Sequence, residues 1–339
     1  MKLPINSGKK TGVQDTGTLP AKKQLTTAER LTSSSYTSNI SNWFIEKWFL
    51  LNGTLAVMIL ILIFGFLIRE GLPALREVGL MEFLTGTRWM PSSPREAGYG
   101  ALPFILGSVM VTVGALAIAI PWGIATAIFI SEVAPKRVKE FLKPIVEVLA
   151  IFPSVILGFI ALVIVSPIIA TVFDLSNGRT ALTASIMLAI MALPTIISIT
   201  EDALNTVPND FREAAIALGA SRWETVKMVV IPAARSGIVA SVMLGFGRAV
   251  GETMTVLMAA GNALSMPVKD VWNIAIPNFL VSVRTLTANI AIEASDVPWG
   301  SLHYSALFVV AMILFVITFT VNLIADILIQ RQQGAMRND

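Results

Sequence analysis

Arg248 and Glu252 are charged side chains that lie deep in an apolar run of this chain, where charges are rare. They stand four residues apart, so a continuous helix would present both on one face. A central Arg in a membrane-spanning helix costs roughly 2.5–3.5 kcal/mol, and such residues therefore face a bundle interior and serve a pathway or a partner. Two interpretations remain open at this point: an ion pair within the helix that holds the fold, or two side chains that line the route of an anion.

The chemistry of this pair fits a phosphate ion. Arg offers a planar fork of donors to an oxyanion, and Glu can accept a hydrogen bond from a phosphate that still carries a proton. Sulfate, which is fully deprotonated, would face an unpaired carboxylate. We therefore expect Arg248, Glu252 and the adjacent Thr253 to line a transport pathway.

A second polar cluster, in the segment 262–303, comprises Arg284, Thr285, Thr287 and Asn289. Its side chains could meet an anion or a protein that delivers one. We include Arg284, Thr285 and Asn289 in the expected pathway. The alternative is a polar loop at the membrane interface.

The remaining ionisable residues narrow the chemistry. A single histidine, His303, and the absence of cysteine exclude disulfides, thiolate metal sites and the usual zinc clusters. We expect no metal site, no catalytic residue and no cofactor held by this chain. His303 is predicted to be an interfacial residue, and Glu132 and Glu147 are predicted to be solvated or capping charges at the ends of apolar segments.

The elements that position these residues are predicted to be membrane helices. A hydrophobic fraction of 55%, a charged fraction of 14% and a mean hydropathy of +0.74 place the 339 residues outside the soluble globular class. Six apolar segments reach the roughly 20 residues that a bilayer core demands: 50–68, 101–130, 148–173, 180–200, 237–261 and 304–325. The predicted fold is an all-α membrane protein with six transmembrane helices.

The distribution of Lys and Arg orients these helices, since cytoplasmic flanks carry the excess of positive charge. The excess lies before residue 48, in the loops 131–143 and 201–236, and in the C-terminal tail, so both termini are expected in the cytoplasm. The segment 271–277 is too short to span, which predicts a re-entrant or interfacial piece. The expected organisation is a polar cytoplasmic tail (1–41), a first span with an extracytoplasmic loop (42–100), a core (101–330) with a cytoplasmic hairpin (210–232), and a second cytoplasmic tail (331–339).

The hairpin 210–232 has two capping-box spacings, Asp210 with Glu213 and Ser221 with Glu224. Gly219 stands between them, where the first helix must stop and turn. Small residues follow Glu213 at Ala214, Ala215 and Ala217, and they leave a surface that another protein can approach closely. The pattern predicts a helical hairpin that docks a soluble partner.

This stretch resembles the EAA loop of ABC importer permeases. Glu213, Ala214, Ala215, Gly219 and Pro232 match that pattern in type and spacing, while Val229 and Ile231 replace its Ile and Leu. In that family the loop forms a coupling helix that inserts into a groove of the ATP-hydrolysing subunit. The resemblance therefore implies that Glu213, Ala214, Ala215 and Gly219 dock an ATPase.

Further blocks are similar to the phosphate importer permeases within that group: 119–135, 151–159 and 247–254. The blocks 98–107 and 283–290, with His303-Tyr304, resemble the C-type (PstC) subunit. Ser305 departs from that subunit's pattern, where a basic residue is expected. The resemblance covers about residues 80–330.

The resemblance implies the transmembrane domain of a type I ABC importer in the bacterial cytoplasmic (inner) membrane. It implies a sister permease subunit, an ABC ATPase dimer that holds ATP and Mg, an extracytoplasmic phosphate-binding protein and surrounding membrane lipid, with no nucleic acid. Gly8-Lys9-Lys10-Thr11 lacks the earlier glycine of a Walker A loop, so ATP hydrolysis is expected on another chain. The alternatives are an ABC permease for another oxyanion, such as sulfate or molybdate, and a secondary transporter or membrane sensor.

Overall fold

The computed structural model describes residues 27–93, 96–271 and 274–335. It divides into two units, 1–62 and 63–339, and the account below concerns the second unit. The helix α1 (Thr27–Glu77) begins inside the segment that the sequence predicts as a tail, and residues 1–26 of that tail lie outside the described part of the chain.

Long helices dominate the second unit. The longest are α3 (Leu102–Ile128), α4 (Lys136–Ile151), α7 (Ala181–Asn205), α11 (Arg235–Gly251) and α14 (Leu302–Ala335). Shorter helices and π-helical turns connect them: α2 (Leu80–Thr85), η1 (Phe129–Val133), α5 (Ser154–Ile160), η2 (Ala161–Val165), α6 (Ser166–Val172), α8 (Asn209–Ala217), α9 (Arg222–Thr225), η3 (Val226–Val230), α10 (Ile231–Ala233), α12 (Met254–Ala259) and α13 (Leu286–Glu293).

Within the described residues, five helical stretches are long and apolar enough to cross a membrane. They run over Asn42–Glu77, Leu102–Val133, Ser154–Val172, Ala181–Asn205 and Leu302–Ile324. A sixth is possible if the helix Arg222–Ala233 and α11, which meet at 69°, are one bent span. The predicted all-α membrane fold is therefore confirmed, with five spans in the described residues or six if the bent pair is one span.

Two predicted spans are not continuous helices. The expected span 148–173 breaks at Phe152, whose backbone is extended (φ −57°, ψ 127°) because Pro153 follows it. The expected span 237–261 breaks at Glu252, which is also extended (φ −72°, ψ 122°) and separates α11 from α12. Both predictions of a single helix are wrong at these positions.

The segment 268–277 contains two paired strands. β3 (Val268–Val271) and β4 (Ile274–Pro277) pair in an antiparallel hairpin, with Val268 opposite Pro277. Ile274 and Ile276 are branched residues at alternate positions, which favours a strand. The predicted re-entrant or interfacial position of 271–277 stays a prediction. A second short hairpin joins β1 (Trp89–Met90) to β2 (Gly98–Tyr99).

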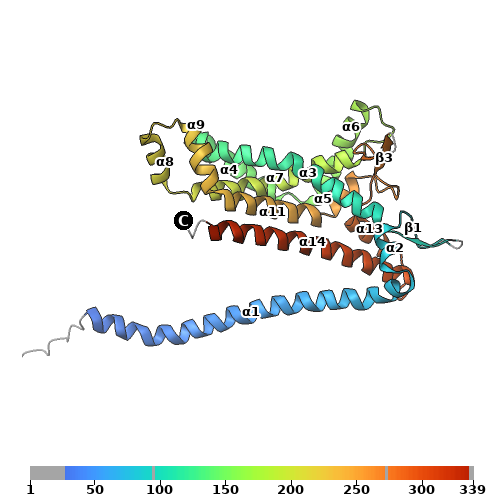
Figure 1. The fold of residues 1–339 in the computed structure, drawn as a ribbon, viewed down its shortest axis with the longest axis horizontal. Helices are drawn as coiled ribbons and strands as arrows, with labels where there is room; N and C mark the ends of the chain where they lie inside the picture. Colours follow the sequence, from blue (N-terminus) through green and yellow to red (C-terminus); the bar gives the residue numbers. More distant parts are fainter. Residues whose placement is uncertain (1–26, 94–95, 272–273, 336–339) are drawn as a thin grey trace, which may run out of the picture. The chain divides into compact units, whose positions relative to one another are not determined.

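The core is centred on α7, which packs between α3 and α11 (Figure 1). Ile196 of α7 is fully buried and faces glycines on both neighbours. A Cβ on Gly123 of α3 would lie 2.7 Å from the Ile196 side chain, and one on Gly245 of α11 would lie 2.8 Å from it. Small residues at helix contacts are how membrane bundles bring backbones close.

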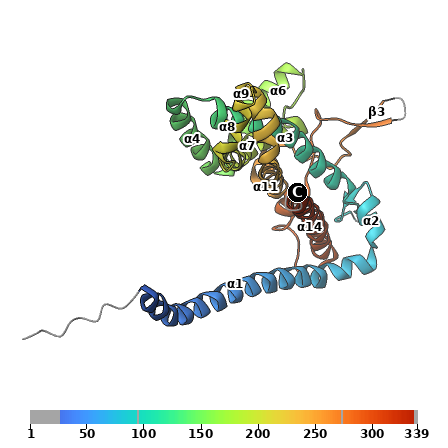
Figure 2. The same ribbon diagram turned by 60° about the vertical axis from the view of Figure 1, so that its left-hand side comes forward.

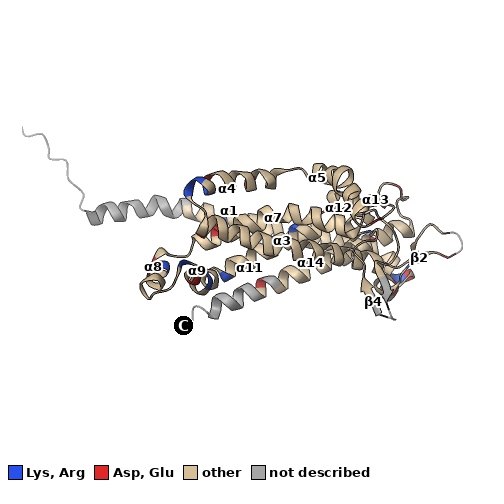
Figure 3. Ribbon diagram, turned by 90° about the horizontal axis from the view of Figure 1, so that it is seen from above, with Lys and Arg blue, Asp and Glu red and all other residues tan. Residues whose placement is uncertain are grey.

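The polar elements gather at the two ends of this bundle. The hairpin α8–α9 lies at one end, together with the start of α4, and the two β-hairpins with α13 lie at the other (Figures 1 and 2). Charged residues follow the same division, and the middle of the helices is largely uncharged (Figure 3). Any charge in that middle therefore stands out as a functional candidate.

Candidate functional site

The hairpin α8–α9 folds largely as its sequence predicts. Gly219 has φ +93°, the left-handed conformation that ends α8 and that glycine adopts most readily. Ser221 and Glu224 form a complete capping box: Ser221 Oγ accepts from the Glu224 backbone N–H at 3.3 Å, and Glu224 Oε2 accepts from the Ser221 backbone N–H at 2.8 Å. These hydrogen bonds hold the pKa of the Glu224 carboxyl below its ordinary value.

The first predicted capping box is wrong. Pro208 precedes α8 and Asn209 is its first residue, so Asp210 already lies inside the helix and caps nothing. A proline next to the first turn is favourable because that turn lacks partners for its N–H groups. Asp210 remains near the positive end of the helix dipole, where a carboxylate is stabilising.

The outer surface of the hairpin is available for a partner. Glu213, Ala214 and Gly219 are exposed and Ala215 is half-buried. Large apolar side chains stand out beside them, and Leu218 is 90% exposed. The others are Phe211, Ile216, Trp223 and Met228. Apolar groups clustered on a hairpin that projects from the bundle are suited to contact another protein.

Arg248 lies in the last turn of α11 and donates hydrogen bonds to neutral oxygen atoms on two other helices. Its Nη1 donates to Thr195 Oγ1 of α7 at 3.1 Å, and its Nη2 donates to the Ala150 carbonyl of α4 at 3.2 Å. That carbonyl is in the last turn of α4, where the break before Pro153 removes the next helical N–H partner. Arg248 thus satisfies an orphan carbonyl, and no carboxylate of the described residues forms an ion pair with it.

Glu252 does not share a helix face with Arg248, because α11 ends at Gly251. Its carboxylate accepts the backbone N–H of Thr255 at 3.0 Å and so caps the first turn of α12. The described residues include no ion pair between Arg248 and Glu252 within 4.0 Å, and Glu252 is only 9% exposed. The alternative of an intrahelical ion pair is therefore wrong.

The two helix breaks lie against each other. Thr255 Oγ1 of α12 donates to the Ser154 carbonyl of α5 at 3.0 Å. Gly158 of α5 approaches α12 so closely that an added Cβ would lie 2.8 Å from Met258 Sδ. Thr253, the remaining residue of this break, is half-buried and donates to the Gly251 carbonyl at 3.4 Å. Interrupted helices in a membrane bundle expose backbone polar groups, which is how transporters build ion and substrate sites.

Arg284 lies at the other end of the bundle and is bound to a carboxylate. Its Nη1 donates to Glu293 Oε1 at 2.9 Å and to Asn289 Oδ1 at 3.1 Å, and its Nε donates to the Asn262 carbonyl at 3.1 Å. Burial lowers the pKa of the Arg284 guanidinium, and the charge of Glu293 opposes that shift. Asn289 is fully buried, and its Nδ2 has no hydrogen-bond partner among the described residues.

Thr285 is also buried and structural in this cluster. Its Oγ1 accepts the Ala288 backbone N–H at 3.3 Å and so caps α13. Thr287 Oγ1 donates to the Glu252 carbonyl at 3.3 Å, which ties α13 to the break between α11 and α12. The predicted pathway residues therefore fall into two groups, around Arg248 and around Arg284, with Thr287 between them.

Sequence reasoning missed the residue that organises the second group, Glu293. Its carboxylate also accepts the Trp89 indole N–H at 2.9 and 3.1 Å and lies 2.8 Å from His303 Nε2. His303 is thus part of a polar cluster, and its predicted position at the membrane interface stays a prediction. Contacts between residues as distant in sequence as Trp89 and Glu293 leave no local pattern that could have revealed them.

The two predicted capping carboxylates differ in outcome. Glu132 lies 2.7 Å from Arg212 Nη2 and its side chain is only 10% exposed, so its predicted solvated role is wrong. Glu147 is exposed, as predicted. Within the described ranges, no three His, Cys, Asp or Glu side chains come together as they would around a metal ion.

Comparison with known families decides what kind of protein this bundle is. The family described as "Binding-protein-dependent transport system inner membrane component" matches residues 119–334. The probable ABC transporter permease protein YqgH of Bacillus subtilis is 38% identical over 256 residues, which cover 76% of this chain and 80% of that protein. The chain belongs to this family of inner-membrane permeases.

Other relatives and solved structures agree with that assignment. The phosphate transport system permease protein PstC of Mesorhizobium japonicum is 35% identical to this permease over 298 residues, covering 81% of this chain and 87% of the relative. A bacterial ABC transporter involved in the import of alginate has a TM-score of 0.56 at 14% identity, over 86% of this chain and 99% of that one. The MetNI methionine transporter has a TM-score of 0.51 at 16% identity, over 68% and 97%. The predicted fold of a type I ABC importer transmembrane domain is confirmed.

Proposed function

We propose that this permease is the C-type subunit of an ATP-driven phosphate importer, and that phosphate passes beside Arg248. The observation that carries the proposal is the environment of Arg248: a guanidinium at a pair of helix breaks, bound to a hydroxyl and a carbonyl and to no carboxylate among the described residues. Relatives named PstC support phosphate as the substrate.

Each predicted site residue has a place in this proposal. Arg248 offers its charge to the anion, Glu252 accepts a hydrogen bond from a protonated phosphate oxygen, and Thr253 lines the same break. Arg284, Thr285 and Asn289 hold α13 against that break through Thr287. Glu213, Ala214, Ala215 and Gly219 dock the ATPase.

The proposed assembly contains a sister permease, an ATPase dimer that holds ATP and Mg, and an extracytoplasmic phosphate-binding protein. The hairpin and both termini lie in the cytoplasm, and the cluster around Glu293 lies outside. The proposed divisions are the tails 1–41 and 331–339, the first span with its loop (42–100), and the core (101–330) with its hairpin (210–232). This chain holds no cofactor and catalyses no covalent step, so it converts ATPase movement into alternating access.

The test is ATP-dependent uptake of radiolabelled phosphate into vesicles that contain the full complex, with sulfate and molybdate as competitors. A Glu213→Ala/Gly219→Ala variant of the hairpin is measured beside the wild type. We expect saturable uptake that neither competitor suppresses and that the variant loses. Uptake of sulfate or molybdate in place of phosphate would contradict the proposed substrate, and uptake unchanged by the hairpin variant would contradict the docking assignment.

A further inference from the structure

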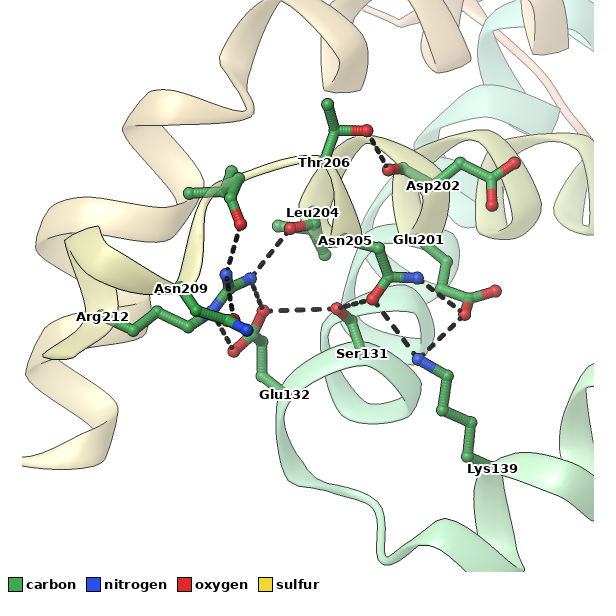
Figure 4. A network of polar contacts seen from close by, with 11 residues as sticks. Ser131, Glu132, Lys139, Glu201, Asp202, Leu204, Asn205, Thr206, Asn209 and Arg212 are labelled. Atoms are coloured by element: carbon green, nitrogen blue, oxygen red, sulfur yellow. Dashed lines mark hydrogen bonds and ion pairs between the residues drawn. The ribbon is translucent and has the colours of Figure 1, made fainter. Parts of the chain in front are cut away.

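Arg212 attaches α8 of the hairpin to the membrane bundle (Figure 4). Its Nη2 lies 2.7 Å from Glu132 Oε1 of η1 and donates to the Leu204 carbonyl at the end of α7 at 2.9 Å. Its Nη1 donates to the Val207 carbonyl in the segment that leads into α8, and its Nε donates to Glu132 Oε2 at 3.3 Å. A planar guanidinium is suited to bind a carboxylate and carbonyls at the same time.

No other side chain of α8 makes a hydrogen bond or ion pair to the bundle in the described part of the chain. Beside this attachment a hollow of about 340 Å³ separates α8 from α10 and the start of α11. Phe211, Val207 and Gly237 are among the residues that line it. The helix α8 is therefore held to the bundle by the polar contacts of Arg212, and the hollow lies beside its residue Phe211.

The returning arm of the hairpin is attached in a different way. Val230 of η3 is fully buried in an apolar cluster with Ile130 of η1 and Leu204 of α7. Apolar packing of this kind is non-directional, whereas the Arg212 contacts fix both distance and direction. Both arms of the hairpin thus contact η1 and the end of α7. The arm α8 does so through directional polar contacts, and the arm η3 does so through apolar packing.

The polar contacts continue from η1 into α4 (Figure 4). Ser131 Oγ lies 3.0 Å from Asn205 Oδ1, and Asn205 Nδ2 donates to Glu201 Oε1 at 3.0 Å. Glu201, which is 2% exposed, binds Lys139 Nζ at 3.2 Å and Lys143 Nζ at 3.1 Å, both from α4. The network therefore joins α8 to η1, α7 and α4.

The two helices at the far end of this network also hold Arg248. Thr195 lies six residues before Glu201 on α7, and Ala150 lies seven residues after Lys143 on α4. A movement of α8 that is transmitted to the ends of α7 and α4 would therefore move both hydrogen-bond acceptors of Arg248.

We propose that Arg212 is the positioning residue that transmits movement of the hairpin to the anion site, through Glu132 and the ends of α7 and α4. This inference rests on the proposed function, because it assigns a coupling role within the same importer. Without Arg212, α8 moves into the adjacent hollow instead of pulling the bundle, so ATP is hydrolysed without transport.

The test measures phosphate uptake and ATP hydrolysis together in vesicles that contain the full complex and its binding protein. Arg212→Gln removes the charge, Arg212→Lys keeps the charge without the fork, and Glu132→Gln removes the carboxylate. Arg137→Gln is the matched control, because Arg137 is an exposed arginine at the same end of the bundle and has no hydrogen-bond partner among the described residues.

We expect Arg212→Gln to lower the phosphate moved per ATP about tenfold, the equivalent of about 1.4 kcal/mol, because the contacts that join α8 to η1 and α7 are lost. Arg212→Lys and Glu132→Gln should give smaller losses, and Arg137→Gln should give none. If uptake and hydrolysis fall in the same proportion, or neither changes, Arg212 has no coupling role. A wild-type complex that hydrolyses ATP without moving phosphate contradicts the proposed function instead.

A second measurement does not depend on the substrate. Hydrogen exchange of the amides of α8 should speed up in Arg212→Gln within the assembled complex, while the amides of η3 should keep their protection because Val230 still packs. Unchanged exchange in α8 would mean that Arg212 does not hold this helix, and the proposal would fail for any substrate.

Discussion

Arg284 and Arg248 are two partly buried arginines whose surroundings differ in one respect. Arg284 is 2.9 Å from Glu293, which also binds His303 and Trp89. Arg248 binds a hydroxyl and a carbonyl, and no carboxylate in the described part of the chain lies within 4.0 Å of it.

We propose that this difference separates a structural charge from a functional one. A guanidinium already paired with a carboxylate must lose that partner before it can hold an anion, and breaking a buried pair is costly. A guanidinium held by neutral oxygens is oriented without being neutralised, so it attracts an anion from the start. In the proposed function, Arg284 therefore fastens the end of the bundle, whereas Arg248 holds the anion.

The largest effect predicted from the comparison of Arg284 with Arg248 is a loss of stability when Glu293 is replaced. We expect Glu293→Ala to destabilise the permease by roughly 3–5 kcal/mol, because it leaves the Arg284 charge buried without its partner. Thermal unfolding in detergent measures the loss. The double variant Glu293→Ala/Arg284→Met should recover part of it, and a single variant as stable as the wild type would mean that the pair is not structural.

A smaller effect is expected on selectivity, at Glu252. Replacing Glu252 by Gln keeps an oxygen that can cap α12 but removes the negative charge that disfavours a fully deprotonated anion. We expect the preference for phosphate over sulfate in competition uptake to fall roughly tenfold, the equivalent of about 1.4 kcal/mol. Glu147→Gln, which changes an exposed carboxylate, is the control. Selectivity that stays constant would remove Glu252 from the anion route.

The smallest effect is expected in the hairpin, away from both arginines. Ser221→Ala should weaken the start of α9 by about 1 kcal/mol, since an N-cap hydroxyl contributes about that much. Faster hydrogen exchange of the α9 and η3 amides would register the loss. Amides that exchange at the wild-type rate would show that the capping box contributes nothing.

The same capping box gives a pH dependence whose sign is fixed. Hydrogen bonds from Ser221 hold the pKa of Glu224 below its ordinary value of 4.5. A carboxyl whose pKa is lowered on folding stabilises the structure above its unfolded pKa, and this contribution disappears as the pH falls through the folded pKa. We expect protection of the α9 amides to decrease below about pH 4.5 in the wild type. Glu224→Gln should abolish that decrease, and an equal decrease in the variant would assign it to another group.

Local patterns explain why the hairpin and the spans could be predicted. Three features depend only on neighbours within a few residues: the Ser221 capping box, the turn at Gly219 and the apolar segments. The structure confirms that the capping box and the turn form and that long apolar helices are present. Glu252 could not be placed in the same way, because a run of apolar and small residues does not show that its helix ends at Gly251.

Pairs that are distant in sequence account for the remaining errors. Glu132 with Arg212, and Glu293 with Trp89, are brought together by the packing of whole helices and loops. Each charged residue looks like a solvated side chain when only its sequence neighbours are considered. The pairing of Arg284 with Glu293 could not be predicted either, although these two residues lie only nine positions apart.

The most direct test of the account compares the two arginines in one assay. Phosphate uptake per assembled complex is measured for Arg248→Gln and for the charge-balanced double variant Arg284→Gln/Glu293→Gln. We predict that Arg248→Gln lowers uptake by roughly tenfold or more, the loss expected for hydrogen bonds to a charged group, and that the double variant keeps most of it. Uptake that survives in Arg248→Gln but is lost in the correctly assembled double variant would contradict the account.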